Sequence, residues 1–247
     1  MNIFKSIVII IIFFNKFNFA NANETYFDLS ENKIEINTDF IGKEIIIFGI
    51  LEDNKETILT IKGPLKNSKI QKKERILGFW FNTKHITYEN VPSTFFIAAS
   101  SKIDNILPIS TLIKEELSFD YVLENKISNR NFISNDSQNI WKKNFVRLKI
   151  NKNLFKEYEI NNINDKLFQT RVFFPPNSIP GEYIVSVYKI KNNIITERDE
   201  KMIIIEKSGI GSKIFNFAHN HSAAYGLFTI IFAIISGLLA ATLFRRS

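Results

Sequence analysis

The feature that most constrains this chain is an uncharged apolar segment near its carboxyl end. Residues 223–244 contain no charged side chain, and Arg245 and Arg246 follow at once. A helix of this length is about 30 Å long, which matches the hydrocarbon core of a bilayer. We therefore expect a transmembrane helix over residues 222–244 and a tail over residues 245–247. Arginines directly after a span are typical of a cytoplasmic end.

A second apolar run lies near the amino end. Lys5 precedes an unbroken apolar run at residues 7–14, and an Ala-x-Ala cleavage pattern ends at Ala22. This order predicts a secretory signal peptide over residues 1–22, with an uncleaved anchor as the alternative. In both cases residues 23–207 are expected outside the cytoplasm. We expect a single-pass inner-membrane protein with its amino-terminal domain in the periplasm and its carboxyl terminus in the cytoplasm.

The net charge of +7 comes mostly from the targeting and anchoring segments. Five of the 32 basic residues and none of the 25 acidic residues lie outside residues 23–207, so this segment carries only +2. Such a balance does not favour a nucleic-acid partner. The chain has no cysteine, which excludes disulfides and thiolate sites, and no motif in it predicts a cofactor or a metal.

The exterior segment is organised as two strand-rich parts around a helical one. Residues 23–107 and 159–207 contain short runs rich in β-branched and aromatic residues, separated by Gly, Pro and Asn. Residues 108–158 instead carry apolar residues at helical spacing. We expect an antiparallel, immunoglobulin-like β-sandwich with a small helical insertion, a juxtamembrane segment at residues 208–221, and the carboxyl-terminal span. Whether the strands form one sandwich or two is left open.

The expected helices have defined apolar faces. The first face carries Leu112, Ile113 and Leu117. The second helix is expected to extend through Phe155, with an apolar face formed by Ile140, Trp141, Phe145, Leu148 and Phe155. These faces are predicted to close one side of the β core.

The stretch "KKERILGFWFN" at residues 72–82 is unusual because both alternating faces of its apolar part are apolar. A strand of this kind is expected to be covered on both sides, either by the helical segment or by another protein. Gly78 leaves room for close approach to the backbone, and Trp80 is the natural anchor of an interface. We take Arg75, Gly78 and Trp80 as a candidate partner surface.

Almost the whole exported chain, including this stretch, resembles a known family. "TIKGPLKNSKIQKKERILGFWFN", "NVPSTFFIAASS", "LFQTRVFFPPNSIPGEYIVSVY" and "AYGLFTIIFAIISGLLAATLFRRS" occur in this order and resemble the alphaproteobacterial putative transmembrane protein family. The Trp80 segment and the terminal Phe-Arg-Arg are the most specific parts. The resemblance implies a location and a topology but no reaction. It also implies a polytopic permease of the sulfite-exporter type as a candidate partner, besides the lipid bilayer.

Other polar clusters have ordinary explanations. Six basic residues between Lys62 and Arg75 are typical of a solvated strand edge, with an anion or lipid-headgroup site as the alternative. His219 and His221 lack the further ligands of a metal site. Glu115 and Glu116 are adjacent, so on a helix their side chains point apart.

A stripe of small residues runs along the expected span. Gly226, Ala233, Gly237 and Ala241 share one helix face and allow close approach of another helix, although a simple anchor needs no such stripe. These features favour a non-catalytic binding or accessory subunit of a membrane complex. An envelope enzyme of unrecognised type and a purely structural envelope factor are the alternatives.

Overall fold

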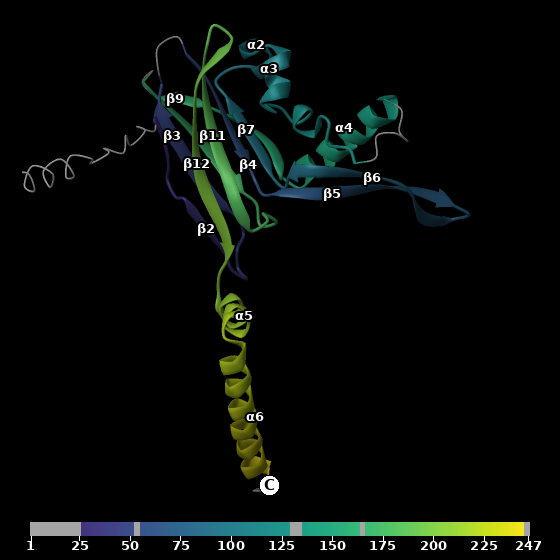
Figure 1. Ribbon diagram of the computed structural model, residues 1–247, viewed down its shortest axis with the longest axis vertical. Helices are drawn as coiled ribbons and strands as arrows, with labels where there is room; N and C mark the ends of the chain where they lie inside the picture. The colour runs from purple at the N-terminus through teal and green to yellow at the C-terminus, as the bar shows by residue number, and fades with distance from the viewer. Residues whose placement is uncertain (1–25, 52–54, 129–134, 164–165, 245–247) are drawn as a thin grey trace, which may run out of the picture.

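The computed structural model describes residues 26–51, 55–128, 135–163 and 166–244 of the chain. A β-rich domain stands on a long carboxyl-terminal helix, and a two-stranded hairpin leaves the domain sideways (Figure 1). The expected signal peptide and the terminal arginines lie outside the described residues.

Two β-sheets face each other across an apolar core. The first sheet has the strand order β1-β3-β10-β9. Its strands are Phe27–Leu29, Lys43–Ile50, Leu167–Phe174 and Asn161–Ile163. The second sheet has the order β2-β12-β11-β4-β7-β8. Its strands are Lys33–Ile36, Ile194–Lys207, Gly181–Lys191, Glu56–Lys62, Phe95–Ala99 and Phe155–Glu159. Strand β10 alternates exposed and buried side chains, as expected for a sheet with one face on a core.

The two strand-rich parts of the chain complete one sandwich. Strand β10 pairs with β3, and β11 pairs with β4, so strands from both sides of the helical insertion are neighbours. The pairing is antiparallel except at β2–β12 and β7–β8, which are parallel. The expected antiparallel sandwich is therefore present, with parallel pairing at these two places. Strands β2 and β8 are not joined to their partners by hairpins, and longer connections permit parallel pairing.

A second apolar core covers the outer face of the six-stranded sheet. It lies beneath four helical elements, α2, α3, η1 and α4, at Ile103–Ile106, Ile109–Lys114, Tyr121–Leu123 and Asn135–Asn151. In β4, Leu59 and Ile61 point into the sandwich core, whereas Ile58 points into this second core. Because both faces of β4 are covered, residues 57–61 of this strand are all buried, including two threonines. The prediction of a mainly β fold with a small helical insertion is confirmed.

The helices end earlier than the apolar spacing indicates. Helix α4 stops at Asn151, and Phe155 belongs to β8 instead. Asn153 has a φ of +55°, and the amide of Leu154 donates to the carbonyl of Lys149, which is a left-handed helix stop. Of the apolar faces expected for the two helices, Leu112, Leu117 and Phe145 are buried, whereas Ile113, Ile140 and Leu148 are exposed.

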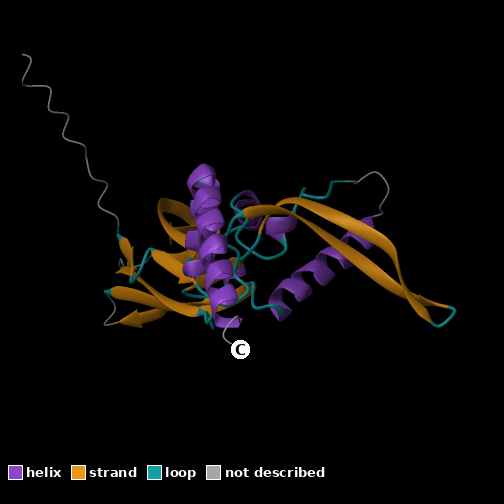
Figure 2. Ribbon diagram, turned by 90° about the horizontal axis from the view of Figure 1, so that it is seen from below, coloured by secondary structure: helices purple, strands orange, loops and turns teal. Residues whose placement is uncertain are grey.

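The long hairpin is formed by β5 (Leu65–Ile76) and β6 (Phe79–Pro92). Both strands extend beyond the domain, and α4 runs alongside their base (Figures 1 and 2). The stretch at residues 72–82 is thus a turn between two strands, with Ile76 paired to Phe79, and not one covered strand. The expectation that the helical segment covers this stretch is wrong.

The chain ends in two helices below the domain. Helix α5 (Ile210–Asn220) forms the neck, and α6 (Ser222–Phe244) extends away from the domain (Figure 1). Helix α6 is long and apolar enough to cross a membrane, and none of its residues is buried by the domain. The expected carboxyl-terminal apolar helix is therefore present with the predicted bounds.

Candidate functional site

The base of the β5–β6 hairpin is fixed to the domain. Ile86, Tyr88 and Val91 of β6 are buried in the second core. The Tyr88 ring lies 4.9 Å from the ring of Phe145 in α4. The amide of Glu89 donates to the carbonyl of Lys126, with a nitrogen–oxygen distance of 2.7 Å. The hairpin is therefore held at its base, and its distal half projects from a rigid support.

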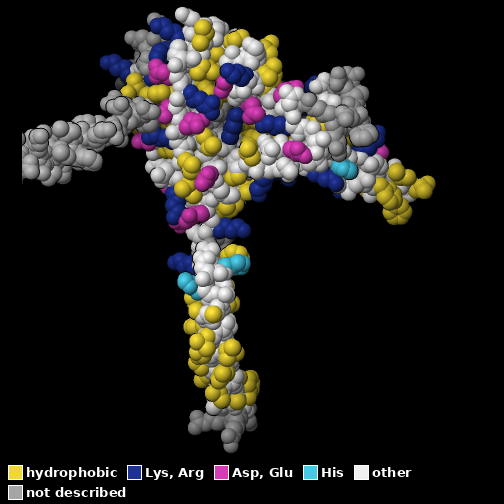
Figure 3. All heavy atoms as spheres, in the orientation of Figure 1, with side chains coloured by type: hydrophobic (Ala, Val, Ile, Leu, Met, Phe, Trp, Pro, Cys, Tyr) yellow, Lys and Arg dark blue, Asp and Glu magenta, His cyan; other side chains and the backbone are white. Residues whose placement is uncertain are grey.

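The distal end carries an exposed apolar cluster that we call the hairpin tip. Its members are Ile76, Leu77, Phe79, Trp80 and Phe81, whose relative exposures are 47%, 94%, 72%, 69% and 50%. Scattered exposed apolar residues are ordinary, whereas contiguous exposed apolar clusters are a feature of protein, membrane and ligand interaction sites. Figure 3 shows it as a hydrophobic end on an otherwise polar hairpin. Arg75 and Trp80 are cross-strand partners at this end, and Gly78 forms the turn between the strands.

The turn at the tip has an unusual residue for its backbone. Leu77 and Gly78 have φ values of +49° and +89°. Both central residues of a two-residue hairpin turn with positive φ are ordinarily Asn, Asp or Gly. The Arg75 Nε donates to the Gly78 carbonyl at 3.2 Å and supports the turn. A leucine at a positive φ costs backbone energy that asparagine would avoid.

Basic side chains surround the tip. We define the basic collar as Lys72, Lys73, Arg75 and Lys84, all of which are exposed. Lys72 forms an ion pair with Glu74 at 2.7 Å. Residues 65–92 contain six basic and two acidic residues, although the whole of residues 23–207 carries only +2. The positive charge of residues 23–207 is thus concentrated on the hairpin.

Lys62, the first of the six clustered basic residues, has a different environment. It lies in a hollow of about 760 Å³ at the base of the hairpin, among charged residues from several elements. Its Nζ lies 3.2 Å from the Glu116 carboxylate, which also pairs with Lys126 at 2.7 Å. Burial lowers the pKa of Lys62 despite this partner. Burial also acts to raise the pKa of Glu116, but the two lysines outweigh it and hold this pKa below its ordinary value.

A second set of ion pairs involves Arg198, which lines the same hollow. Arg198 contacts the Glu115 carboxylate at 3.2 Å and the Glu200 carboxylate at 2.6 Å. Ser186 donates to the same Glu200 oxygen at 2.8 Å. Glu115 and Glu116 thus engage different cations. These ion pairs join residues 115–116 to strands β4 and β12, and Glu182 is a further carboxylate at the hollow.

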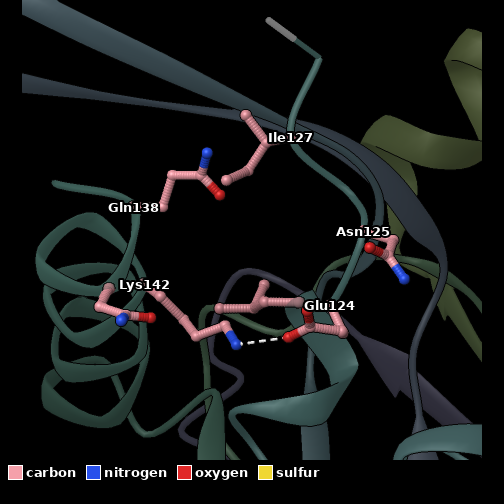
Figure 4. A pocket seen from close by; sticks show the side chains of 7 residues that line it. Glu124, Asn125, Ile127, Gln138 and Lys142 are labelled. Carbon is pink, nitrogen blue, oxygen red and sulfur yellow. Dashed lines mark hydrogen bonds and ion pairs between the residues drawn. The ribbon is translucent and has the colours of Figure 1, made fainter. Parts of the chain in front are cut away.

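A smaller hollow of about 240 Å³ lies between α4 and the loop at residues 123–127 (Figure 4). Lys142 of α4 forms an ion pair with Glu124 of this loop at 2.7 Å, and Gln138 and Ile127 lie nearby in the same hollow. This arrangement ties α4 to the loop that supports the hairpin base.

The two histidines of the neck lie beside aromatic rings of their own segment, and the His219 ring is stacked on its partner. The His219 ring lies 4.0 Å from the ring of Phe215, and the His221 ring lies 6.0 Å from the ring of Phe217. The third histidine, His85, is exposed on the hairpin. The neck histidines therefore pack within α5 and at its end.

The small-residue stripe of α6 faces open space. A side chain added at Gly226 or Gly237 would meet no atom within 4 Å. Ala233 and Ala241 are exposed. The structure therefore separates the sequence-predicted residues into two places, the hairpin tip and the span. The predicted surface did not include the other apolar residues of the tip, because the stretch was interpreted as one strand and not as a turn. These residues are Ile76, Leu77, Phe79 and Phe81.

A comparison with family models gives one match, to a family described as putative transmembrane protein, over residues 24–246. Neither the curated proteins nor the solved structures contain a match to the chain. The match covers the sandwich, the hairpin, the neck and α6 together. Among the described residues, one helix, α6, is suited to cross a membrane. The chain is therefore a member of this transmembrane protein family.

Proposed function

We propose that this protein is a non-catalytic accessory subunit of a membrane complex, which holds a partner protein through the hairpin tip. The observation that carries the proposal is the exposed apolar cluster from Ile76 to Phe81 at the end of a supported hairpin. Aromatic residues, and Trp above all, dominate the binding energy of protein interfaces. A pre-formed arm also lowers the entropy lost on binding.

In this proposal, the remaining parts of the chain position the hairpin tip beside its partner. Helix α6 anchors the protein in the inner membrane, the β-rich domain lies in the periplasm, and Arg245 and Arg246 lie in the cytoplasm. The partner is a polytopic membrane protein, for which a permease of the sulfite-exporter type is our candidate. The stripe of Gly226, Ala233, Gly237 and Ala241 provides a second contact within the bilayer.

The proposal predicts that the full chain, extracted in mild detergent, co-purifies with a polytopic membrane protein. Trp80→Ala should lower the recovered partner by about tenfold or more, because the loss of an interface Trp costs about 2 kcal/mol or more. Gly237→Ile should lower it as well, because a bulky residue separates the two helices.

Ser236→Ile is the matched control for the span, because it adds similar bulk about a quarter turn away from the stripe. It should leave the recovery unchanged. Recovery of the chain alone, after crosslinking in cells and mild extraction, would contradict the accessory role.

A further inference from the structure

We propose that the hairpin tip inserts into an apolar pocket with an acidic rim, on a protein that stands beside this one in the same membrane. The inference rests on the proposed function and specifies the chemistry and the position of the receptor. Three independent observations carry it: the residue chosen at the turn, the charge around the tip, and the direction of the hairpin.

The first observation is Leu77. Its backbone lies at a φ of +49°, and its side chain is 94% exposed, with no burial to repay the strain. Asparagine followed by glycine would satisfy the same turn at lower cost. Neither the turn nor the domain core therefore accounts for a leucine here. An apolar pocket that receives this side chain would supply the missing stabilisation, since fully burying a leucine contributes about 1.5–3 kcal/mol.

The second observation is the basic collar. Lys73 and Lys84 are exposed near the tip, and Arg75 pairs across the strands with Trp80. The hairpin carries four more basic than acidic residues, whereas the remainder of residues 23–207 is slightly acidic. Complementary potentials orient the approach of two proteins and disfavour wrong partners. A receptor for this tip is thus expected to place carboxylates around its apolar pocket.

The third observation is the direction in which the hairpin leaves the domain. The hairpin leaves the domain to the side of α6, and its tip lies on the domain side of the neck (Figure 1). If α6 crosses the bilayer, this position lies above the lipid surface and away from the anchor. A protein that projects from the same membrane beside the anchor is accessible to the tip in this geometry, whereas lipid is accessible only after the domain tilts.

The contact is made by side chains and not by addition of a strand. The β5–β6 register shifts between Lys66 and Ser68 and again between Lys72 and Lys73. Exposed lysines accompany both irregularities. Bulges and lysines are devices that protect strand edges from pairing with other chains. The apolar end of the hairpin is therefore the part suited to docking.

The test uses the full chain in its native membrane, with a photoreactive phenylalanine analogue in place of Phe79. We expect a defined adduct with another membrane protein, and we expect the crosslinked peptide to lie in an exterior part of that protein next to Asp or Glu residues. Leu77→Asn should lower the adduct about tenfold, in line with the loss of a buried leucine, while the turn becomes more favourable. Loss of the adduct in this variant therefore cannot be attributed to unfolding.

Charge reversal distinguishes the effect of the basic collar from the effect of the protein's overall charge. Lys73→Glu with Lys84→Glu should lower the adduct about tenfold, and added salt should weaken the wild-type adduct. Lys66→Glu with Lys69→Glu makes the same charge change nearer the hairpin base and should have a much smaller effect. An unchanged adduct after collar reversal, or an adduct only with lipid or with a second copy of this chain, would overturn the inference. A protein adduct that survives collar reversal would leave the proposed function standing, whereas an adduct only with lipid or with a second copy of this chain would remove both.

Discussion

Truncation of the chain after Lys207 should release the protein from the membrane. The truncated chain lacks α5 and α6 but keeps every strand of the sandwich and the hairpin. Helix α6 is the described helix with the length and composition of a span, and nothing in the domain buries it. We expect the full chain in the membrane pellet after an alkaline wash, and the truncated chain in the periplasmic fraction.

A chimera provides the control for this truncation. Replacing residues 222–244 with an unrelated leucine-rich span of the same length should restore membrane retention. The same chimera lacks the small-residue stripe. It therefore shows whether membrane anchoring is independent of the proposed contact between α6 and a partner helix. Retention of the truncated chain in the washed membrane would contradict both the cleaved signal peptide and the role of α6 as the anchor.

Phe155→Ala should cause the largest loss of stability among single substitutions at the second core. Phe155 is fully buried in β8, and its ring lies 5.9 Å from that of Phe95 and 5.4 Å from that of Phe119. It joins the edge strand to the helical layer. Replacing a buried Phe with Ala costs about 3–5 kcal/mol, because apolar contacts are lost and a cavity remains. Denaturant unfolding of the full chain in detergent measures this loss.

Ile140→Ala is the matched control, because Ile140 is 62% exposed on α4. Its effect should stay within about 0.5 kcal/mol, as is usual for surface substitutions. Equal effects of the two substitutions would mean that the helical layer does not pack on the sheet through Phe155.

Much of the architecture was accessible from sequence because it depends on local patterns. The long uncharged apolar segment indicated the membrane-spanning helix, and the runs rich in β-branched and aromatic residues indicated the sheets. The helix ends were missed because Asn153 and Glu116 adopt positive φ values that spacing alone does not reveal. The parallel pairing of β2 and β8 depends on contacts between distant segments. Local sequence carries little information about such contacts.

The candidate surface was predicted in part. Arg75, Gly78 and Trp80 were chosen for their residue types, and the structure places all three at the exposed tip. The secondary structure around them was predicted wrongly, because in sequence a turn with apolar flanks resembles a strand with two apolar faces. The charged hollow between Lys62, Glu116 and Arg198 was not predicted, because its residues come from three separate parts of the chain.

The central claim is that a partner covers the hairpin tip in the native membrane. The absence of cysteine from the chain makes single-cysteine labelling a direct test. Asn82 and Gln71 are both exposed, Asn82 next to the tip and Gln71 farther along the hairpin.

The measurement compares the rates at which Asn82→Cys and Gln71→Cys react with a hydrophilic maleimide, in native membranes and in the purified chain in lipid vesicles. The account predicts that Asn82→Cys reacts about tenfold more slowly in native membranes, as expected if a partner occupies nine tips in ten. Gln71→Cys should react equally fast in both. Equal rates at Asn82→Cys in the two preparations would contradict the account.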